Sequence, residues 1–268
     1  MDILFLQLLI LPMLTLVVLS FALAPLGCFL VWKRLTFFSD GLSHACTFGI
    51  ALALFLKIHF LVGILLTALA IAFILFFSEK YQYVSIDIFF SLLSSTFFAG
   101  GVIALSLIKG AHISIDDILF GDFLAIQRED FFVALSLSLI ALVVLFVYWR
   151  DLLLSCISPD LAKVNSARAK NGDVIFILIT ACLIAFGMYL VGALLLPALI
   201  ILPVACARVL SVSPQQMMVY SIVLSILSCC LGITLSSILD IPTSATMVFS
   251  SSFIFVVLCV LKKRMINA

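Results

Sequence analysis

Long apolar segments joined by short polar connections are the feature that most constrains this chain. About 20 apolar residues cross a bilayer as a helix. Backbone polar groups inside a membrane must be satisfied within each such segment, so we expect the segments to be α-helices. Hydropathy places them near residues 3–32, 37–56, 60–77, 86–108, 131–149, 174–190, 193–209, 216–238 and 244–261.

The composition supports a membrane protein. Of 268 residues, 66% are hydrophobic and 10% are charged, whereas a soluble domain is about half apolar and a quarter charged. Too little polar surface remains to cover a water-facing globule. We predict an all-α polytopic integral membrane protein with about eight or nine transmembrane helices, forming one domain over residues 1–268. The net charge of +1 gives no sign of the basic surface that binds nucleic acid.

Several other classes of protein are disfavoured by what the sequence lacks. The eight cysteines form no CxxC pair and lie mostly in apolar segments, so we interpret them as small hydrophobic residues. No GxxxxGK[ST] motif is present, so the chain does not bind ATP through a P-loop of its own. The start Met1-Asp2-Ile3 lacks the basic region of a signal peptide.

The distribution of Lys and Arg predicts the orientation. With nine spans and a cytoplasmic C-terminus, only Lys57, Lys109 and Arg128 of the 14 basic residues lie outside, which satisfies the positive-inside rule. Residues 109–130 then form an external loop and residues 150–173 a cytoplasmic segment. If one segment is re-entrant, the spans number eight and the N-terminus moves inside.

Prolines interrupt two of the apolar segments. The first carries Pro12 and Pro25, and we expect it to be bent or broken near Pro25. The seventh is interrupted by Pro197 and Pro203. Such breaks are tolerated where protein or a cavity satisfies the freed backbone groups.

Asp40 and His44 form the only closely spaced carboxylate–imidazole pair within an apolar segment. Positions i and i+4 of a helix share a face, so the two side chains can hold one divalent cation together. His44 would lie roughly 10 Å into the span, where charge is costly and indicates function. Carboxylate and imidazole suit zinc, and also manganese or ferrous iron.

Two features of this pair remain open at the level of sequence. One Asp and one His are too few for a tetrahedral site, but a homodimer with facing second spans would supply two of each. The alternative is purely local: Asp40 caps the helix and His44 hydrogen-bonds a neighbouring carbonyl.

Two further residues are weaker candidates for metal ligands. His112 and Asp116 repeat the i,i+4 spacing in the external loop, where a short amphipathic helix lying on the surface is the alternative. Asp240 precedes Ile241-Pro242 in an outer connection and either passes on the metal or stabilises a turn.

The cytoplasmic segment contains a predicted short helix. Ser158 can cap it with Pro159 at the first helical position, and Leu161 and Val164 would share one side. Such a helix suits a groove in a cytoplasmic partner, and a plain linker is the alternative. The candidate coupling residues are Ser158, Pro159, Asp160, Leu161, Ala162, Lys163, Val164 and Ser166.

Seven stretches, in order and spacing, resemble the permease subunits of the metal-ion ABC importers, the zinc/manganese/iron family, and within it the bacterial zinc-uptake permeases. They are residues 25–34, 38–45, 119–122, 157–162, 191–198, 201–208 and 240–242.

The resemblance implies a homodimer in the lipid of the bacterial plasma (inner) membrane, two cytoplasmic ATP-binding subunits and an external metal-binding protein. It implies that Asp40 and His44 are metal ligands and that 158–170 is the coupling helix, although Ser166 stands where the family usually has glycine. The expected cargo is Zn²⁺, with manganese or iron as the alternative, and no cofactor is expected to stay bound.

Two rival functions come from other classes. A gradient-driven transporter would need membrane carboxylates for coupling, and the predicted spans have almost none. A non-transporting membrane scaffold has no reason to keep Asp40 and His44 within a span.

Overall fold

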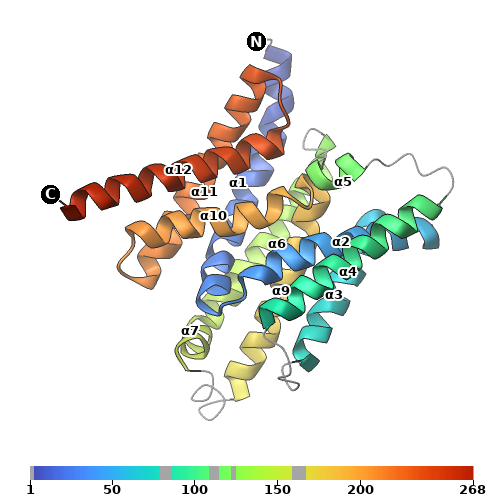
Figure 1. Cartoon of the computed structure of the whole chain (residues 1–268), viewed down its shortest axis with the longest axis horizontal. Coiled ribbons are helices and arrows are strands. Elements are labelled where there is room, and N and C mark those ends of the chain that lie inside the picture. Colours follow the sequence, from blue (N-terminus) through green and yellow to red (C-terminus); the bar gives the residue numbers. More distant parts are fainter. Residues whose placement is uncertain (1–2, 79–85, 109–114, 122–124, 159–166, 268) are drawn as a thin grey trace.

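The computed structural model describes residues 3–78, 86–108, 115–121, 125–158 and 167–267, and within these ranges it contains helices and connections but no strand (Figure 1). All nine expected segments are α-helices there, and two short helices lie in the polar connections. The long helices are α1 (Ile3–Trp32), α2 (Thr36–Leu56), α3 (Phe60–Ser78), α4 (Ile86–Leu107), α6 (Arg128–Val147), α9 (Ala167–Val191), α10 (Leu195–Leu210), α11 (Pro214–Leu239) and α12 (Thr243–Asn267), and the short ones are α5 (Ile115–Phe120) and α7 (Trp149–Ile157).

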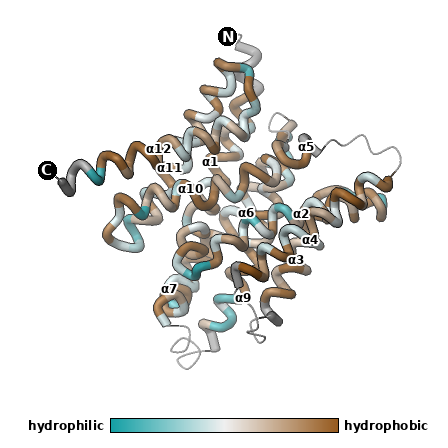
Figure 2. Tube along the Cα trace, in the orientation of Figure 1, coloured by the Kyte–Doolittle hydropathy of each residue, from teal (hydrophilic) through white to brown (hydrophobic). Residues whose placement is uncertain are grey.

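Seven helices among the described residues are long and apolar enough to cross a membrane, while α3 and α10 are shorter apolar helices. Hydrophobic residues run along nearly the whole of each helix, and hydrophilic ones gather mainly near helix ends (Figure 2). The predicted polytopic α-helical architecture is therefore confirmed.

The helices form two groups around α1. On one side α2 packs against α3 and α4, and α3 packs against α9. On the other side α10, α11 and α12 pack together, and α10 and α11 contact α1, which also contacts α6. Burial follows this arrangement: 72% of the apolar window of α1 is buried within the chain, against 11% for α4. Most of α4 therefore faces outward, toward lipid or another subunit.

The prolines act differently from the sequence expectation. α1 is one continuous helix through Pro12 and Pro25, so the expected break near Pro25 is wrong, while a bend there stays a prediction. Packing on α6, α10 and α11 supports the continuous helix. Pro197 lies in the first turn of α10, where its missing N–H removes no intrahelical bond. The actual interruption precedes it, between α9 and α10.

Helix α5 fills that interruption. Ala193 and Leu194 donate backbone hydrogen bonds to the carbonyls of Ile118 (3.1 Å) and Leu119 (3.1 Å). Gly121 (φ 66°) and Gly192 (φ 85°) meet where the two segments touch, and a Cβ on Gly192 would lie 2.6 Å from the Gly121 nitrogen. The break is satisfied by protein, as expected. Ile118 is buried, so α5 is docked in the fold and does not simply lie on its surface as expected.

Candidate metal-binding site

A tight turn between α1 and α2 fixes where the site helix begins. Arg34 takes a left-handed conformation (φ 59°). Its N–H bonds the Val31 carbonyl at 3.2 Å, and the Leu35 N–H bonds the Leu30 carbonyl at 2.8 Å. This pair of bonds is the Schellman motif, which ends a helix by satisfying its last carbonyls. Because α2 starts immediately afterwards, at Thr36, the direction of α2 is set by the end of α1.

An ion pair anchors the same turn to α9. Lys33 Nζ lies 2.7 Å from Asp173 Oδ1, and the two side chains are 12% and 36% exposed. Lys33 also lies 6.0 Å from the centroid of the Phe176 ring. Cys156 of α7 is nearby, and burial raises the pKa of its thiol to about 11. Burial therefore disfavours the thiolate form of this cysteine.

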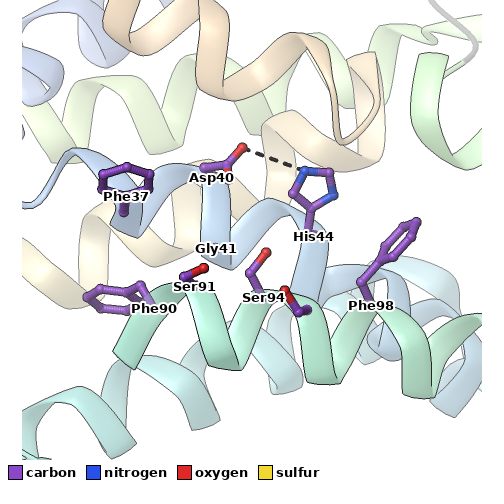
Figure 3. Close-up of a pocket in the computed structure, with 9 residues that line it drawn as sticks. Phe37, Asp40, Gly41, His44, Phe90, Ser91, Ser94 and Phe98 are labelled. Carbon is purple, nitrogen blue, oxygen red and sulfur yellow. Dashed lines mark ion pairs between the residues drawn. The ribbon is translucent and has the colours of Figure 1, made fainter. Parts of the chain in front are cut away.

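Asp40 and His44 lie on the face of α2 that looks toward α4 (Figure 3). His44 Nε2 is 3.6 Å from Asp40 Oδ1, so both ligand atoms point to one place, as the i,i+4 spacing predicts. Phe38 and Leu42, each two residues from Asp40, are buried, and Phe38 packs on Phe90 of α4.

The purely local explanation of the pair does not fit the structure. The N-cap of α2 is Leu35, and Asp40 lies a full turn further on, so Asp40 does not cap the helix. His44 Nδ1 is buried and makes no hydrogen bond within the described part of the chain. The imidazole is held instead by an edge contact with Phe98, at 5.4 Å between ring centroids.

A groove of about 300 Å³ opens between α2 and α4 at this pair. Phe37, Phe90 and Phe98 form its apolar walls. Polar side chains reach it from both helices, since Ser91, Ser94 and Ser95 of α4 face Asp40 and His44 of α2. The groove is large enough for a divalent cation with several water molecules, each of which occupies about 30 Å³ in the liquid.

One chain supplies only part of a metal coordination sphere. Among the described residues, no three His, Cys, Asp or Glu side chains come together. Two ligands from Asp40 and His44 fall short of the four that zinc usually takes. The remaining positions must be filled by water, by hydroxyls or by another chain.

Of the other predicted metal ligands, Asp240 is not brought to the groove. Asp240 is an exposed C-cap of α11 in a left-handed conformation (φ 52°, ψ 44°), directly before Ile241-Pro242. His112 and the coupling residues 159–166 lie outside the described residues. Ser158 ends α7 with an extended backbone, as a residue before proline requires. Their predicted roles remain predictions.

Three serines of the groove were missed from the sequence. Ser91, Ser94 and Ser95 sit at i, i+3 and i+4 of an apolar segment, which is the spacing of one helix face. That pattern was visible, but only the packing of α4 on α2 shows that this face meets Asp40. The long-range pair Lys33–Asp173 had no sequence signal.

The described helices, with a polar groove between two of them, define a polytopic membrane protein. A profile of the ABC 3 transport family matches residues 6–262. The chain therefore belongs to the ABC 3 transport family.

Relatives and solved structures agree with this assignment. The high-affinity zinc uptake system membrane protein ZnuB of Haemophilus influenzae is 33% identical over 94% of this chain and 97% of its own length. The manganese transport system membrane protein MntC of Halalkalibacterium halodurans is 26% identical over 86% of this chain and 79% of its own. The structure of PsaBC from Streptococcus pneumoniae in complex with Fab shares the fold, with a TM-score of 0.80 and 23% identity over 92% of this chain and 89% of that one.

Proposed function

We propose that this chain is the membrane-spanning permease subunit of an ATP-driven importer of divalent metal ions, with Zn²⁺ as its cargo. One observation carries the proposal: in a chain of a transport family, Asp40 and His44 of a membrane helix point together into a groove. An ionisable pair is costly in a span unless it serves a function.

The metal site is completed by symmetry. A second copy of the chain, placed with its α2–α4 face against the first, adds a second Asp40 and His44 and gives four ligands. The outward-facing surface of α4 supports this arrangement, because only 11% of its apolar window is buried within the chain. The permease therefore works as a homodimer, and each subunit holds half of the site.

ATP is hydrolysed by a separate cytoplasmic subunit. The segment 150–173 lies in the cytoplasm with the C-terminus, and Ser158 to Ser166 dock on that subunit. An external metal-binding protein delivers the ion to the loop 109–130 on the other side, past His112, Asp122 and Asp240. The whole chain, residues 1–268, is one domain in the bacterial inner membrane.

The ligand set suits transport better than storage. A carboxylate and an imidazole from each subunit bind a divalent ion without the closed cage of thiolates that structural zinc sites use. A transport site must bind the ion well enough to accept it and weakly enough to release it. ATP binding and hydrolysis then tilt the two permeases between outward-facing and inward-facing states.

Zinc is preferred because the zinc-uptake relative is more similar to the chain than the manganese relative is. Manganese is the second candidate, since carboxylate and imidazole also bind it. Elemental analysis of cells that lack or overproduce this chain with its ATPase separates the two. Zinc content is expected to follow expression, and a change in manganese alone would overturn the choice of metal.

The site is tested by metal uptake in cells carrying Asp40→Ala or His44→Ala. Each variant should reduce zinc uptake by about 100-fold, because it removes a ligand from both halves of a symmetric site. Membrane levels of the variants are matched by immunoblot. His59→Asn is the control, since His59 is an exposed histidine at the connection between α2 and α3. Wild-type uptake from both site variants would refute the proposed site.

A further inference from the structure

Three hydroxyl groups face the proposed metal ligands across the groove. Ser91, Ser94 and Ser95 of α4 line it opposite Asp40 and His44. Figure 3 shows Ser91 and Ser94 rising from α4 toward α2. Among the described residues of α4 that line the groove, these three are polar and the other two are Phe90 and Phe98.

These hydroxyls differ from most hydroxyls of the apolar helices, although Thr47 and Ser138 also lack a partner within the described residues. Serine and threonine in a membrane helix usually donate to a carbonyl one turn back. Ser43, Thr67 and Ser250 do so at 2.7–2.9 Å, and Ser106, on α4 itself, donates to Ile103 at 2.8 Å. Within the described residues, Ser91, Ser94 and Ser95 make no such bond. They are therefore free to bind a ligand.

Packing of α4 on α2 does not account for them. That contact is made by Phe90 against Phe38, at 5.3 Å between ring centroids, and by the close approach of Gly101 to the backbone of Thr47 and Phe48. Ser91 and Ser95 are exposed and lie outside the contact. A hydroxyl in an exposed position of an apolar helix adds nothing to packing within the chain.

We propose that Ser91, Ser94 and Ser95 form a hydroxyl shelf that holds the retained water ligands of the cation beside Asp40 and His44. This inference rests on the proposed metal site and names the residues that stabilise the hydrated ion there. Protons of metal-bound water are strong hydrogen-bond donors, and a serine oxygen accepts them. Because the hydroxyls are neutral, they stabilise the hydrated ion without trapping it.

The shelf also explains how the groove can be polar beside three phenylalanines. A cation that enters an apolar passage loses hydration, and that loss is costly unless protein oxygens replace it. Three hydroxyls on one helix face, spaced i, i+3 and i+4, offer successive acceptors along about one turn of α4. The ion can then exchange water molecules for Asp40 and His44 stepwise.

The test measures Zn²⁺ binding by equilibrium dialysis of the purified permease with its ATPase subunit, and zinc uptake in cells. The triple variant S91A/S94A/S95A should bind Zn²⁺ about 10-fold more weakly, since it loses hydrogen bonds to charged or polarised partners. The triple Ser→Thr variant keeps the hydroxyls and should stay within about twofold. Ser106→Ala is the matched control on the same helix and should bind as wild type.

Each outcome separates this inference from the site itself. If S91A/S94A/S95A binds and transports zinc as wild type while Asp40→Ala does not, the shelf is refuted and the metal site stands. If Asp40→Ala also behaves as wild type, the proposed function falls and the shelf with it. If light scattering shows that the triple Ala variant loses binding because the dimer separates, the serines serve subunit contact and the shelf is refuted. Ser91→Ala and Ser95→Ala alone, at exposed positions, give the same comparison if the triple variant is poorly produced.

Discussion

Two regions of this molecule treat polar groups in opposite ways. At the junction of α5 with the α9–α10 break, the freed N–H groups of Ala193 and Leu194 are both paired with carbonyls. In the groove between α2 and α4, His44 Nδ1 has no partner within the described residues, and the Asp40 side chain is 48% exposed. A closed junction serves the fold, whereas open polar groups in an apolar protein leave places for a ligand.

The largest loss of stability is expected from a side chain added at Gly192, where α5 meets the α9–α10 break. Gly192→Ala puts a Cβ 2.5 Å from the Leu119 carbonyl oxygen in a backbone conformation (φ 85°) that disfavours side chains. We expect a loss of about 3–5 kcal/mol, or failure to fold, from combined strain and clash. Thermal unfolding in detergent measures it.

Gly100→Ala is the control for that variant. A Cβ on Gly100 meets only Phe48, at an ordinary 3.6 Å, and alanine favours the helix by about 0.8 kcal/mol over glycine. The melting temperature should therefore stay equal or rise. Equal melting temperatures for the Gly192→Ala and wild-type proteins would contradict the idea of a closed junction.

A smaller loss is expected when one member of a satisfied pair is removed. Lys33→Met leaves Asp173 without its cation at 2.7 Å and should cost about 1–3 kcal/mol, less than for a fully buried pair because Asp173 is partly exposed. The double variant Lys33→Met/Asp173→Leu removes both charges and should recover at least half of that loss. No recovery in chemical unfolding would show that Lys33 acts by packing alone.

The smallest effect on stability is expected in the groove. Within the described residues, the one ion pair of Asp40 is with His44, at 3.6 Å, and the Asp40 side chain is half-exposed. Exposed pairs contribute little to stability, so Asp40→Ala should change the free energy of unfolding by no more than about 0.5 kcal/mol. The same variant is expected to abolish uptake. A loss of more than about 1 kcal/mol would show that Asp40 stabilises the fold. The groove would then not differ from the α5 junction in the way described above.

Much of the architecture was readable from the sequence because it depends on single segments. All nine hydropathic segments are helices, and the segment expected at 216–238 is observed as Pro214–Leu239. The Asp40–His44 geometry was also predictable, since i,i+4 spacing fixes it within one helix. The predicted break at Pro25 was wrong, because surrounding helices hold the backbone that proline alone would weaken.

The features that the sequence did not predict are contacts between segments that lie far apart in the chain. The serines of α4 meet Asp40 only through the packing of α4 on α2, and α5 reaches the break beside Gly192 through contacts about 70 residues apart in sequence. Gly121 and Gly192 lie in two of the stretches that resemble the permease family, yet nothing in either stretch indicates that they touch. Helix register and long-range ion pairs require coordinates.

The tight turn at residues 33–35 has a mechanical consequence. Two backbone hydrogen bonds close it, and Lys33 is tied to Asp173 near the start of α9. Helix α2 therefore has no free hinge at its N-terminal end, and it can rotate only together with the end of α1. A displacement of the first turns of α9, which follow the segment 159–166, reaches Asp40 through one salt bridge and two helical turns. The Asp40–His44 pair and the start of α9 are thus mechanically coupled.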